Sequence, residues 1–201
     1  MIKHNYTGDL KADVQSLLEL YAKPKRAFGH AKAVAEMNIK IAGQYNLDKN
    51  ICETCGYLHD ISAVISPNNM FMSATKNNWF IDEAEIKFPI LLHQRVSKVI
   101  ARDSFNITDE RILSAIEHHT TLKANPSDYD MALFIADKLA WDQDGDAPFF
   151  AIVSDALKQS LEMASLAYMD YIVENKMILH PHRWFEEGRD FLRNQQKADA
   201  K

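Results

Sequence analysis

The sequence predicts an all-α protein. Along several stretches the apolar residues recur every three or four positions, which is the spacing of one buried helix face. Glycine and proline occur only six times each in 201 residues, so helix-breaking positions are few. No stretch shows the sustained alternation of apolar and polar residues that indicates a half-buried β-strand. We therefore expect a bundle of helices around a shared core.

Composition bounds the class of protein and its partners. The chain is 47% hydrophobic and 25% charged, with a formal net charge of −5, which is ordinary for a globular protein. A negative chain has no general attraction for nucleic acids or anionic membranes, so we expect neither as a partner. No apolar run approaches the ~18 residues of a transmembrane helix, and the N-terminus lacks the apolar segment of a signal peptide. We expect a cytoplasmic protein whose apolar C-terminal helices suit a homodimer face.

The first half of the chain predicts a helical extension over residues 1–25 and then two core helices. Apolar stripes at helical spacing run over residues 28–45 and 51–61. The cluster Ser66-Pro67-Asn68-Asn69 is typical of a turn. After it we expect a loop with a short helix over residues 74–80.

Helix-start signals organise the middle of the chain. Pro89 suits the first position of a helix, and Thr108 suits an N-cap because two acidic residues follow it in the first turn. Ser127 and Asp130 have the spacing of a capping box. That box opens the apolar run that contains Asp137.

The C-terminal part predicts two helices. One long amphipathic helix begins at Pro148 and extends to Tyr171, and the last helix follows His182. We divide the chain into a core at 26–145, C-terminal helices at 146–195 that pack on it, and a frayed tail at 196–201.

Cys52 and Cys55 form a CxxC pair. Such a pair occurs in redox motifs and in zinc sites. No second cysteine pair completes a four-sulfur site, and no strand precedes the motif. We interpret the pair as two reduced thiols on a helix.

Several ionisable residues interrupt the apolar stripes. A single histidine there is usually a core residue with a hydrogen-bonding partner, and a single aspartate is often a cap. Burying an ionised carboxylate costs several kcal/mol unless it is paired or bound to metal, so a set of such residues from successive helices needs a shared cause. We interpret the set as a metal site; imidazole and carboxylate suit iron, manganese or zinc. Its members are His30, His59, Asp60, His93, His119 and Asp137.

The order His, His-Asp, His, His, Asp resembles the ligand pattern of HD-domain phosphohydrolases that hold two metal ions. More closely, the chain resembles the YqeK-type hydrolases, which split diadenosine tetraphosphate symmetrically. The resemblance extends from about residue 26 to residue 141. It is carried by Arg26-Ala-Phe-Gly-His30, Cys55-Gly-Tyr-Leu-His59-Asp60, Leu92-His93, Ala115-Ile-Glu-His-His119-Thr120 and Phe134-Ile-Ala-Asp137.

The resemblance implies an HD-domain helical bundle with ligands converging from five helices. It implies two metal ions, with iron as the first candidate and manganese or another first-row ion as alternatives. In this pattern one ion would be bound by His30, His59, Asp60 and Asp137. The second would be bound by His93 and His119, with Asp60 shared between the two ions. A hydroxide made at the metals, with Asp60 as a catalytic residue, would attack phosphorus in a nucleotide substrate.

Positive and hydroxyl groups near the ligands are candidates for binding that substrate. Arg26 lies one helical turn before His30, and we expect its positive charge to stabilise the anionic transition state. Arg95 and Lys138 are further candidates, although each also suits a solvated face. Thr120 either binds phosphate or orients its neighbouring histidine.

We expect the remaining histidines to lie outside the metal site. His118 points about 100° away from its neighbour on a helix, so we place it at the pocket rim or in solvent. We expect His4, His180 and His182 to be exposed.

Three departures from the YqeK-type pattern concern the substrate. Ala63 stands where those proteins usually have a lysine. Thr121-Leu122-Lys123 replaces a segment with glycine and arginine, and Trp141-Asp142-Gln143-Asp144 replaces an acidic-Pro-X-Arg segment. The resemblance therefore supports the chemistry more strongly than it supports the dinucleotide substrate.

Two alternatives remain open. A mononuclear HD nucleotidase would use His30, His59-Asp60 and Asp137 for one metal, and His93 and His119 for substrate. A non-catalytic nucleotide-sensing module would retain the pocket without hydrolysis.

Overall fold

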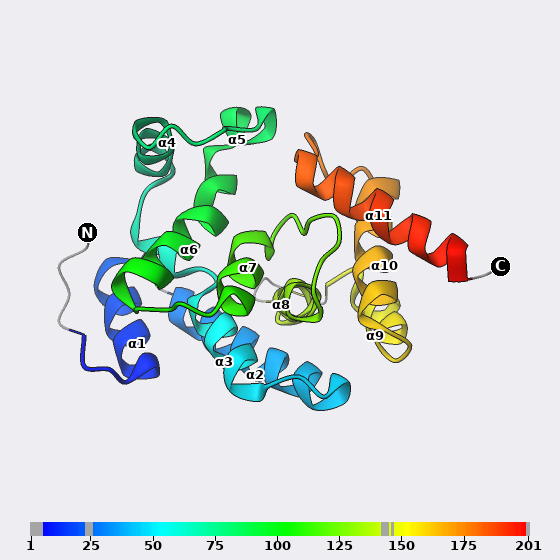
Figure 1. Ribbon diagram of the computed structural model, residues 1–201, viewed down its shortest axis with the longest axis horizontal. Coiled ribbons are helices and arrows are strands. Elements are labelled where there is room, and N and C mark those ends of the chain that lie inside the picture. Colours follow the sequence, from blue (N-terminus) through cyan, green and yellow to red (C-terminus); the bar gives the residue numbers. More distant parts are fainter. Residues whose placement is uncertain (1–5, 23–25, 142–144, 146, 200–201) are drawn as a thin grey trace.

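The computed structural model describes residues 6–22, 26–141, 145 and 147–199. Within these ranges the chain forms helices joined by loops, and no strand occurs in them. The predicted all-α class is thus confirmed (Figure 1).

The first three helices are α1 (Leu10–Tyr21), α2 (Ala27–Tyr45) and α3 (Lys49–Leu58). Asn46 ends α2 in the left-handed conformation, with φ of 55°, and Asp48 caps α3 through the backbone amides of Asn50 and Ile51. The two helices pack closely at Gly56, where an added Cβ would lie 2.3 Å from the Cα of Ala35. Only glycine fits this contact.

The middle of the chain consists of short helices. They are η1 (Ile61–Val64), α4 (Pro67–Lys76), α5 (Glu83–Lys87), η2 (Pro89–Leu92), α6 (His93–Ser104), α7 (Glu110–His118) and α8 (Asp128–Leu139). The capping box at Ser127 is confirmed, because its hydroxyl accepts from the Asp130 amide and the Asp130 carboxylate accepts in return.

Two of our boundaries in this region are wrong. The helix expected over 74–80 begins at Pro67 instead, because the Ser66 hydroxyl caps it and proline occupies its first position. The N-cap of α7 is Asp109 rather than Thr108, since the Asp109 carboxylate accepts from the backbone amide of Arg111.

The C-terminal helices are α9 (Phe150–Leu157), α10 (Leu161–Glu174) and α11 (Arg183–Asp199). The single long helix expected from Pro148 is wrong, because Ser160 adopts an extended conformation and caps α10 as a new helix. The tail expected to be frayed over 196–201 is helical as far as Asp199; residues 200–201 lie outside the described residues.

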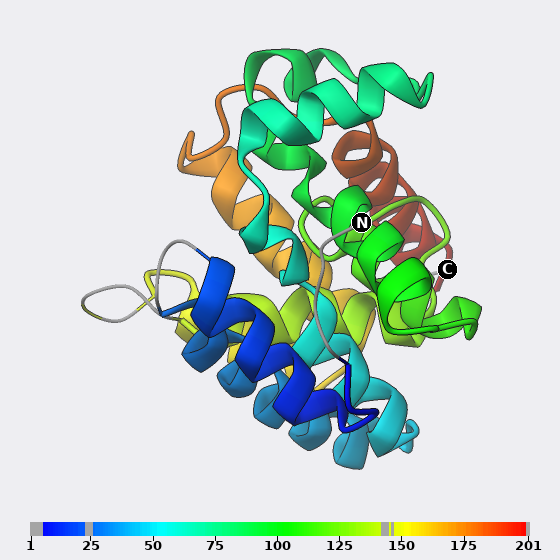
Figure 2. The ribbon, with the colours of Figure 1, turned by 90° about the vertical axis from the view of Figure 1, so that its left-hand side faces the viewer.

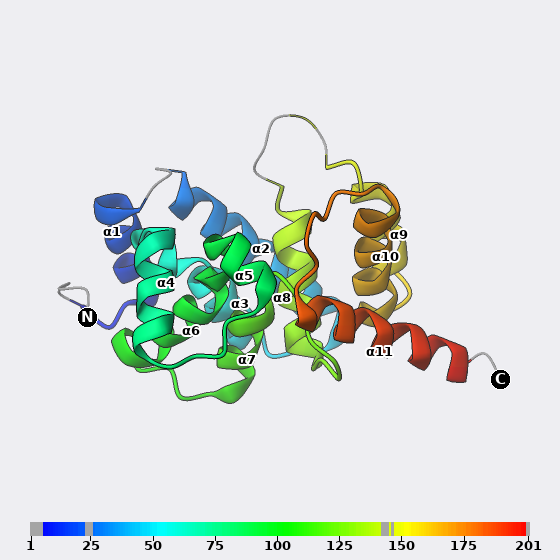
Figure 3. The same cartoon turned by 90° about the horizontal axis from the view of Figure 1, so that it is seen from above.

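One hydrophobic core joins these elements, from Val14 on α1 to Leu192 on α11. The centre of the core is α8, whose residues 131–136 are all buried. Figures 1 and 3 show α8 between the α2–α3 pair and the C-terminal helices, with α1 and α11 at opposite ends. Figure 2 shows α1 lying along α2. Among the described helices, none combines the length and apolarity needed to cross a bilayer.

Candidate metal centre

The His-Asp dipeptide lies where α3 ends. His59 is fully buried at the C-cap position, and Asp60 begins the turn into η1. The tight packing of α3 on α2 at Gly56 brings this turn close to His30, which lies on the first turn of α2. The local fold therefore aims both side chains of the dipeptide inward.

Three histidines share one backbone arrangement. The Nδ1 atom of His59 lies 2.7 Å from the carbonyl of Gly56, that of His93 lies 2.7 Å from the carbonyl of Ile90, and that of His119 lies 2.8 Å from the carbonyl of Ile116. A carbonyl only accepts, so each Nδ1 carries the proton and donates it. Each Nε2 is consequently an unprotonated lone pair in the neutral ring.

These lone pairs face other imidazole nitrogens. The Nε2 atoms of His93 and His119 are 3.1 Å apart, and those of His30 and His59 are 3.3 Å apart. Two lone pairs cannot hydrogen-bond to each other, as between His93 and His119. A cation among these nitrogens would satisfy them, and neutral imidazole is the form that binds metal.

Two carboxylates complete the cluster. The Asp60 Oδ2 atom lies 3.6 Å from His59 Nε2, whereas its Oδ1 lies 3.4 Å from the Nε2 atoms of both His93 and His119. That Oδ1 is buried and accepts no hydrogen bond from the described residues. Asp137 Oδ1 lies 3.1 Å from His30 Nε2. The two oxygens of Asp60 thus face different histidines, as a carboxylate shared between two ions would.

The described residues contain two groups whose ligand atoms lie within 4.8 Å of one another. One is His30, His59 and Asp137, and the other is His59, Asp60 and His119. His93 adjoins the second group through its contacts with His119 and Asp60. All six residues expected as ligands therefore meet in one place, from α2, the end of α3, α6, the end of α7 and α8. Their role as ligands stays a prediction.

Electrostatics favour neutral histidines and ionised carboxylates. Burial lowers the pKa of His59 to about 4 and also lowers the pKa of His93. Both rings are therefore neutral at pH 7, as metal binding requires. Burial raises the pKa of Asp137, but the charge of Lys138 and the contacts with the surrounding histidines together outweigh burial and hold this pKa well below its ordinary value.

Lys138 and Thr120 both contact the expected ligands. The Lys138 ammonium lies 2.5 Å from Asp137 Oδ2 and donates to the carbonyl of His119 at 3.3 Å. The Thr120 hydroxyl lies 3.0 Å from His93 Nε2. These side chains border the cluster, and their contact with substrate stays a prediction.

The two arginines lie in different settings. Arg26 is exposed in the turn before α2, where its carbonyl accepts from the amide of His30 at 3.1 Å. Arg95 lies against the buried Glu85 at 3.1 Å and over the ring of Trp79, 4.6 Å from its centroid. The structure shows a packing role for Arg95, and substrate binding by either arginine stays a prediction.

The predicted exposure of two other histidines is wrong. His118 is buried rather than exposed, because its ring packs on Trp184 of α11 at 4.7 Å. His182 is only 4% exposed and lies 3.6 Å from the Glu85 carboxylate. The fold of α11 back onto the core covers both. His180 is exposed, as expected, and His4 lies outside the described residues.

Sequence reasoning missed Gln94, which is fully buried beside His93. Its carbonyl oxygen accepts from the backbone amide of Thr120 at 3.2 Å and from the Thr121 hydroxyl at 3.3 Å. The amide side chain thus ties α6 to the segment after His119 and fixes the two histidines relative to each other. The one signal in the sequence was a glutamine on an apolar stripe next to an expected ligand.

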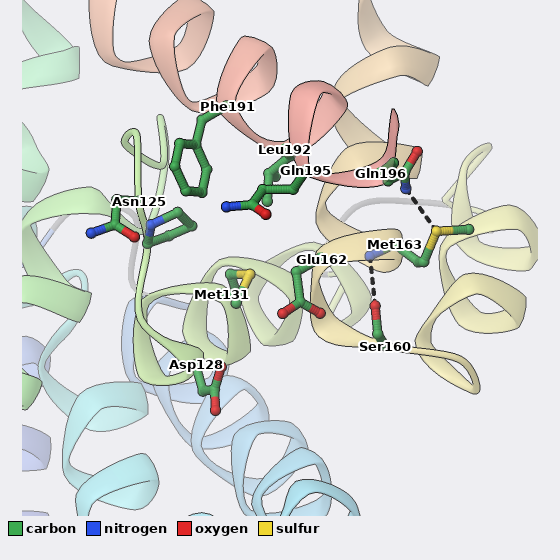
Figure 4. A pocket seen from close by; sticks show the side chains of 11 residues that line it. Asn125, Asp128, Met131, Ser160, Glu162, Met163, Phe191, Leu192, Gln195 and Gln196 are labelled. Atoms are coloured by element: carbon green, nitrogen blue, oxygen red, sulfur yellow. Dashed lines mark hydrogen bonds between the residues drawn. The ribbon is translucent and has the colours of Figure 1, made fainter. Parts of the chain in front are cut away.

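Other features of the described chain lie outside this cluster. A cavity of about 760 Å³ under α11 contains Asp128, Glu162 and Phe191 but none of the six expected ligands (Figure 4). Cys52 and Cys55 are free and buried, and burial raises the pKa of the Cys52 thiol to about 12. The interpretation of the pair as reduced thiols is consistent with both facts. Of the departure at Trp141-Asp142-Gln143-Asp144, residues 142–144 lie outside the described residues.

Comparison with known proteins gives three findings. A family model described as the HD domain matches residues 27–142. An uncharacterized protein in the pepC 5' region of Lactococcus lactis subsp. cremoris is 39% identical over 150 residues, which cover 74% of this chain and 76% of that protein. A Staphylococcus aureus protein named symmetrical bis(5'-nucleosyl)-tetraphosphatase is 31% identical over 114 residues, which cover 57% of this chain and 58% of that protein.

The fold is also similar to that of a solved structure. A predicted HD superfamily hydrolase involved in NAD metabolism from Clostridium acetobutylicum superposes with a TM-score of 0.79. The match covers 92% of this chain and 97% of that chain at 23% identity. At this identity the likeness concerns the fold alone.

Proposed function

The chain belongs to the HD domain family, and from this membership we propose that it is a metal-dependent nucleotide hydrolase that splits dinucleoside tetraphosphates symmetrically. The chain is an HD-type hydrolase. The proposal adds the substrate, the two metal ions and the position of cleavage.

One observation supports two ions more than any other. His93 and His119 present unprotonated Nε2 atoms to each other at 3.1 Å, the Nε2 atoms of His30 and His59 lie 3.3 Å apart, and Asp60 turns one oxygen toward each pair. We assign one ion to His30, His59, Asp60 and Asp137. We assign the other to His93, His119 and Asp60. Iron is the first candidate, because a mixed imidazole and carboxylate set suits it.

The ions would supply positive charge at the phosphate oxygens and a water of lowered pKa. The chain's own residues hold the reacting groups in place. Lys138 helps to keep Asp137 ionised, and Gln94 fixes the spacing between α6 and the segment after His119. In the reaction, the water oxygen bonds to phosphorus while the bond to the central bridging oxygen breaks. One water proton goes to the departing phosphate and the other to solvent, which leaves two nucleoside diphosphates.

The names of relatives support this substrate. A second protein named symmetrical bis(5'-nucleosyl)-tetraphosphatase, from Halalkalibacterium halodurans, is 29% identical over 55% of this chain. These relatives match over only part of their lengths, and Ala63 departs from the related pattern. Direct measurement of the products therefore tests the substrate.

Product analysis tests the proposal. We expect the metal-loaded protein to convert diadenosine tetraphosphate to ADP alone, measured by chromatography of the nucleotides. A strong chelator should abolish turnover, and iron or manganese should restore it. Products of ATP and AMP would contradict symmetrical cleavage, and full activity in chelator would contradict metal dependence. Tight binding of nucleotides without hydrolysis would favour the sensing module.

A further inference from the structure

We propose that two separate cavities flank the metal centre and that each receives one nucleoside end of a dinucleoside polyphosphate. This inference rests on the proposed function and deepens it. It assigns base recognition to side chains that neither family membership nor sequence reasoning identified, notably Tyr21, Phe88 and Tyr168.

The first cavity, which we call the η1 cavity, has a volume of about 810 Å³. Two expected metal ligands, Asp60 and His93, form part of its wall. The rest comes from the end of α1, from η1 and from the start of α4, and includes Tyr21, Ala63 and Asn69. Ala63 leaves room where related proteins usually have a lysine.

The second cavity, which we call the α10 cavity, has a volume of about 380 Å³. Thr120, whose hydroxyl contacts His93 Nε2, lies in its wall. The rest of the wall includes Phe88, Tyr168 of α10 and the exposed His180. The rings of Phe88 and His180 lie 5.8 Å apart at an angle of 39°.

The two cavities share part of their walls close to the expected metal ligands. Ile90 of η2 lines both of them. His93 lies at the same junction, with Asp60 Oδ1 at 3.4 Å on the side of the η1 cavity and the Thr120 hydroxyl at 3.0 Å on the side of the α10 cavity. A substrate with phosphates at this junction would extend its ends into two different spaces.

The chemistry of the walls indicates what those ends are. Among the described residues that line either cavity there is no lysine and no arginine. The Lys87 ammonium lies beside the α10 cavity, 3.2 Å from His180 Nδ1, and does not line it. The walls themselves therefore offer no cation to additional phosphates. Aromatic and aliphatic side chains with a few hydroxyl, amide and imidazole groups are typical of sites for flat, uncharged ligands. Nucleobases stack on such aromatic side chains with little dependence on sequence. Both volumes lie in the range of roughly 300–1,000 Å³ usual for small-molecule sites.

Substitutions in each cavity, with matched controls, test the inference. Phe88→Ala removes one wall of the α10 cavity, and Tyr21→Ala removes one wall of the η1 cavity. Ile86→Ala and Leu20→Ala are the controls, because these side chains are exposed apolar neighbours that line neither cavity. Phe88 and Tyr21 are 37% and 48% exposed, so we expect all four variants to fold.

We expect each cavity variant to raise KM for diadenosine tetraphosphate about tenfold, in line with loss of one stacked base. Its KM for inorganic tetraphosphate, which has no bases, should change less than twofold. The control variants should match the wild type on both substrates. Unchanged KM for diadenosine tetraphosphate in both cavity variants, with normal wild-type activity, would overturn the two cavities and leave the proposed function intact.

Binding without turnover gives a second readout. We expect titration calorimetry of ADP into the metal-loaded wild type to give two sites per chain, with one of them weakened in each cavity variant. This holds even if the wild type cleaves no dinucleoside tetraphosphate, in which case the proposed function fails alone. A single ADP site in the wild type would overturn the inference.

Discussion

At the scale of single residues, backbone carbonyls decide what the centre can bind. The carbonyls of Gly56, Ile90 and Ile116 each hold a histidine Nδ1 proton, so the inner nitrogens remain lone pairs. Each carbonyl lies three residues before its histidine, at or near a helix end. Local helix geometry therefore orients the expected ligands without any ion.

His93→Ala is the residue-scale test of two ions against one. We expect bound metal to fall from about two ions per chain to about one, because His93 contacts only the Asp60 and His119 side of the cluster. Elemental analysis of the purified variant by mass spectrometry measures this. His180→Ala, which changes an exposed histidine, should retain both ions. Unchanged metal content in His93→Ala would favour the mononuclear nucleotidase.

At the scale of elements, the contact between α2 and α3 sets the distance between the first two expected ligands, His30 and His59. Gly56 packs against the backbone of Ala35, and its carbonyl also receives the His59 proton. Any side chain at Gly56 must separate the two helices. The position of His59 relative to His30 depends on this contact.

Gly56→Ala should therefore destabilise the fold and loosen the centre. We expect a loss of about 1–3 kcal/mol in the free energy of unfolding, as for overpacked cores, together with weaker metal binding. Gly43→Ala is the matched control on α2, because its added Cβ meets only the end of Lys49 at 3.6 Å. That control should be neutral or stabilise by up to about 1 kcal/mol. Urea unfolding curves measure both, and equal stability of the two variants would contradict the packing argument.

At the scale of the whole molecule, a buried ion cluster joins the C-terminal helix to the core. Glu85 of α5 is fully buried, 3.1 Å from Arg95 of α6 and 3.6 Å from His182 just before α11. Burial acts to raise the pKa of Glu85. The hydrogen bonds from His182 and the Asp82 amide and the charge of Arg95 outweigh burial and lower this pKa.

Glu85→Gln should cost about 3 kcal/mol of unfolding free energy at pH 7, because it leaves Arg95 without its countercharge. The folded-state pKa of Glu85 lies below its unfolded value. Its stabilisation is thus complete above about pH 4.3 and is lost as the pH falls through the folded pKa. Chemical unfolding at several pH values should show the difference from wild type shrinking below about pH 4.3. Glu83→Gln, an exposed change on the same helix, should have little effect; a difference that persists in acid would contradict the ionic origin.

The sequence by itself determined the helical class, most helix positions and the six residues that converge. These depend on periodicity, on local caps such as Ser127 and on ionisable residues placed on apolar faces, all of which act over a few neighbouring positions. The break at Ser160 escaped prediction because apolar spacing continues across it, and only the backbone conformation shows a new helix.

Only the tertiary structure decided which groups lie around those six residues. Several of these contacts join residues that lie far apart in the sequence. His182 is buried against Glu85, Arg95 pairs with Glu85, and Gln94 hydrogen-bonds to the segment after His119. The periodicity of a sequence carries no information on such distant partners. The two cavities likewise arise where η2 meets α4 on one side and α10 on the other. Chain folding brings these distant segments together. For this reason the surroundings of the centre could not be predicted from local sequence patterns.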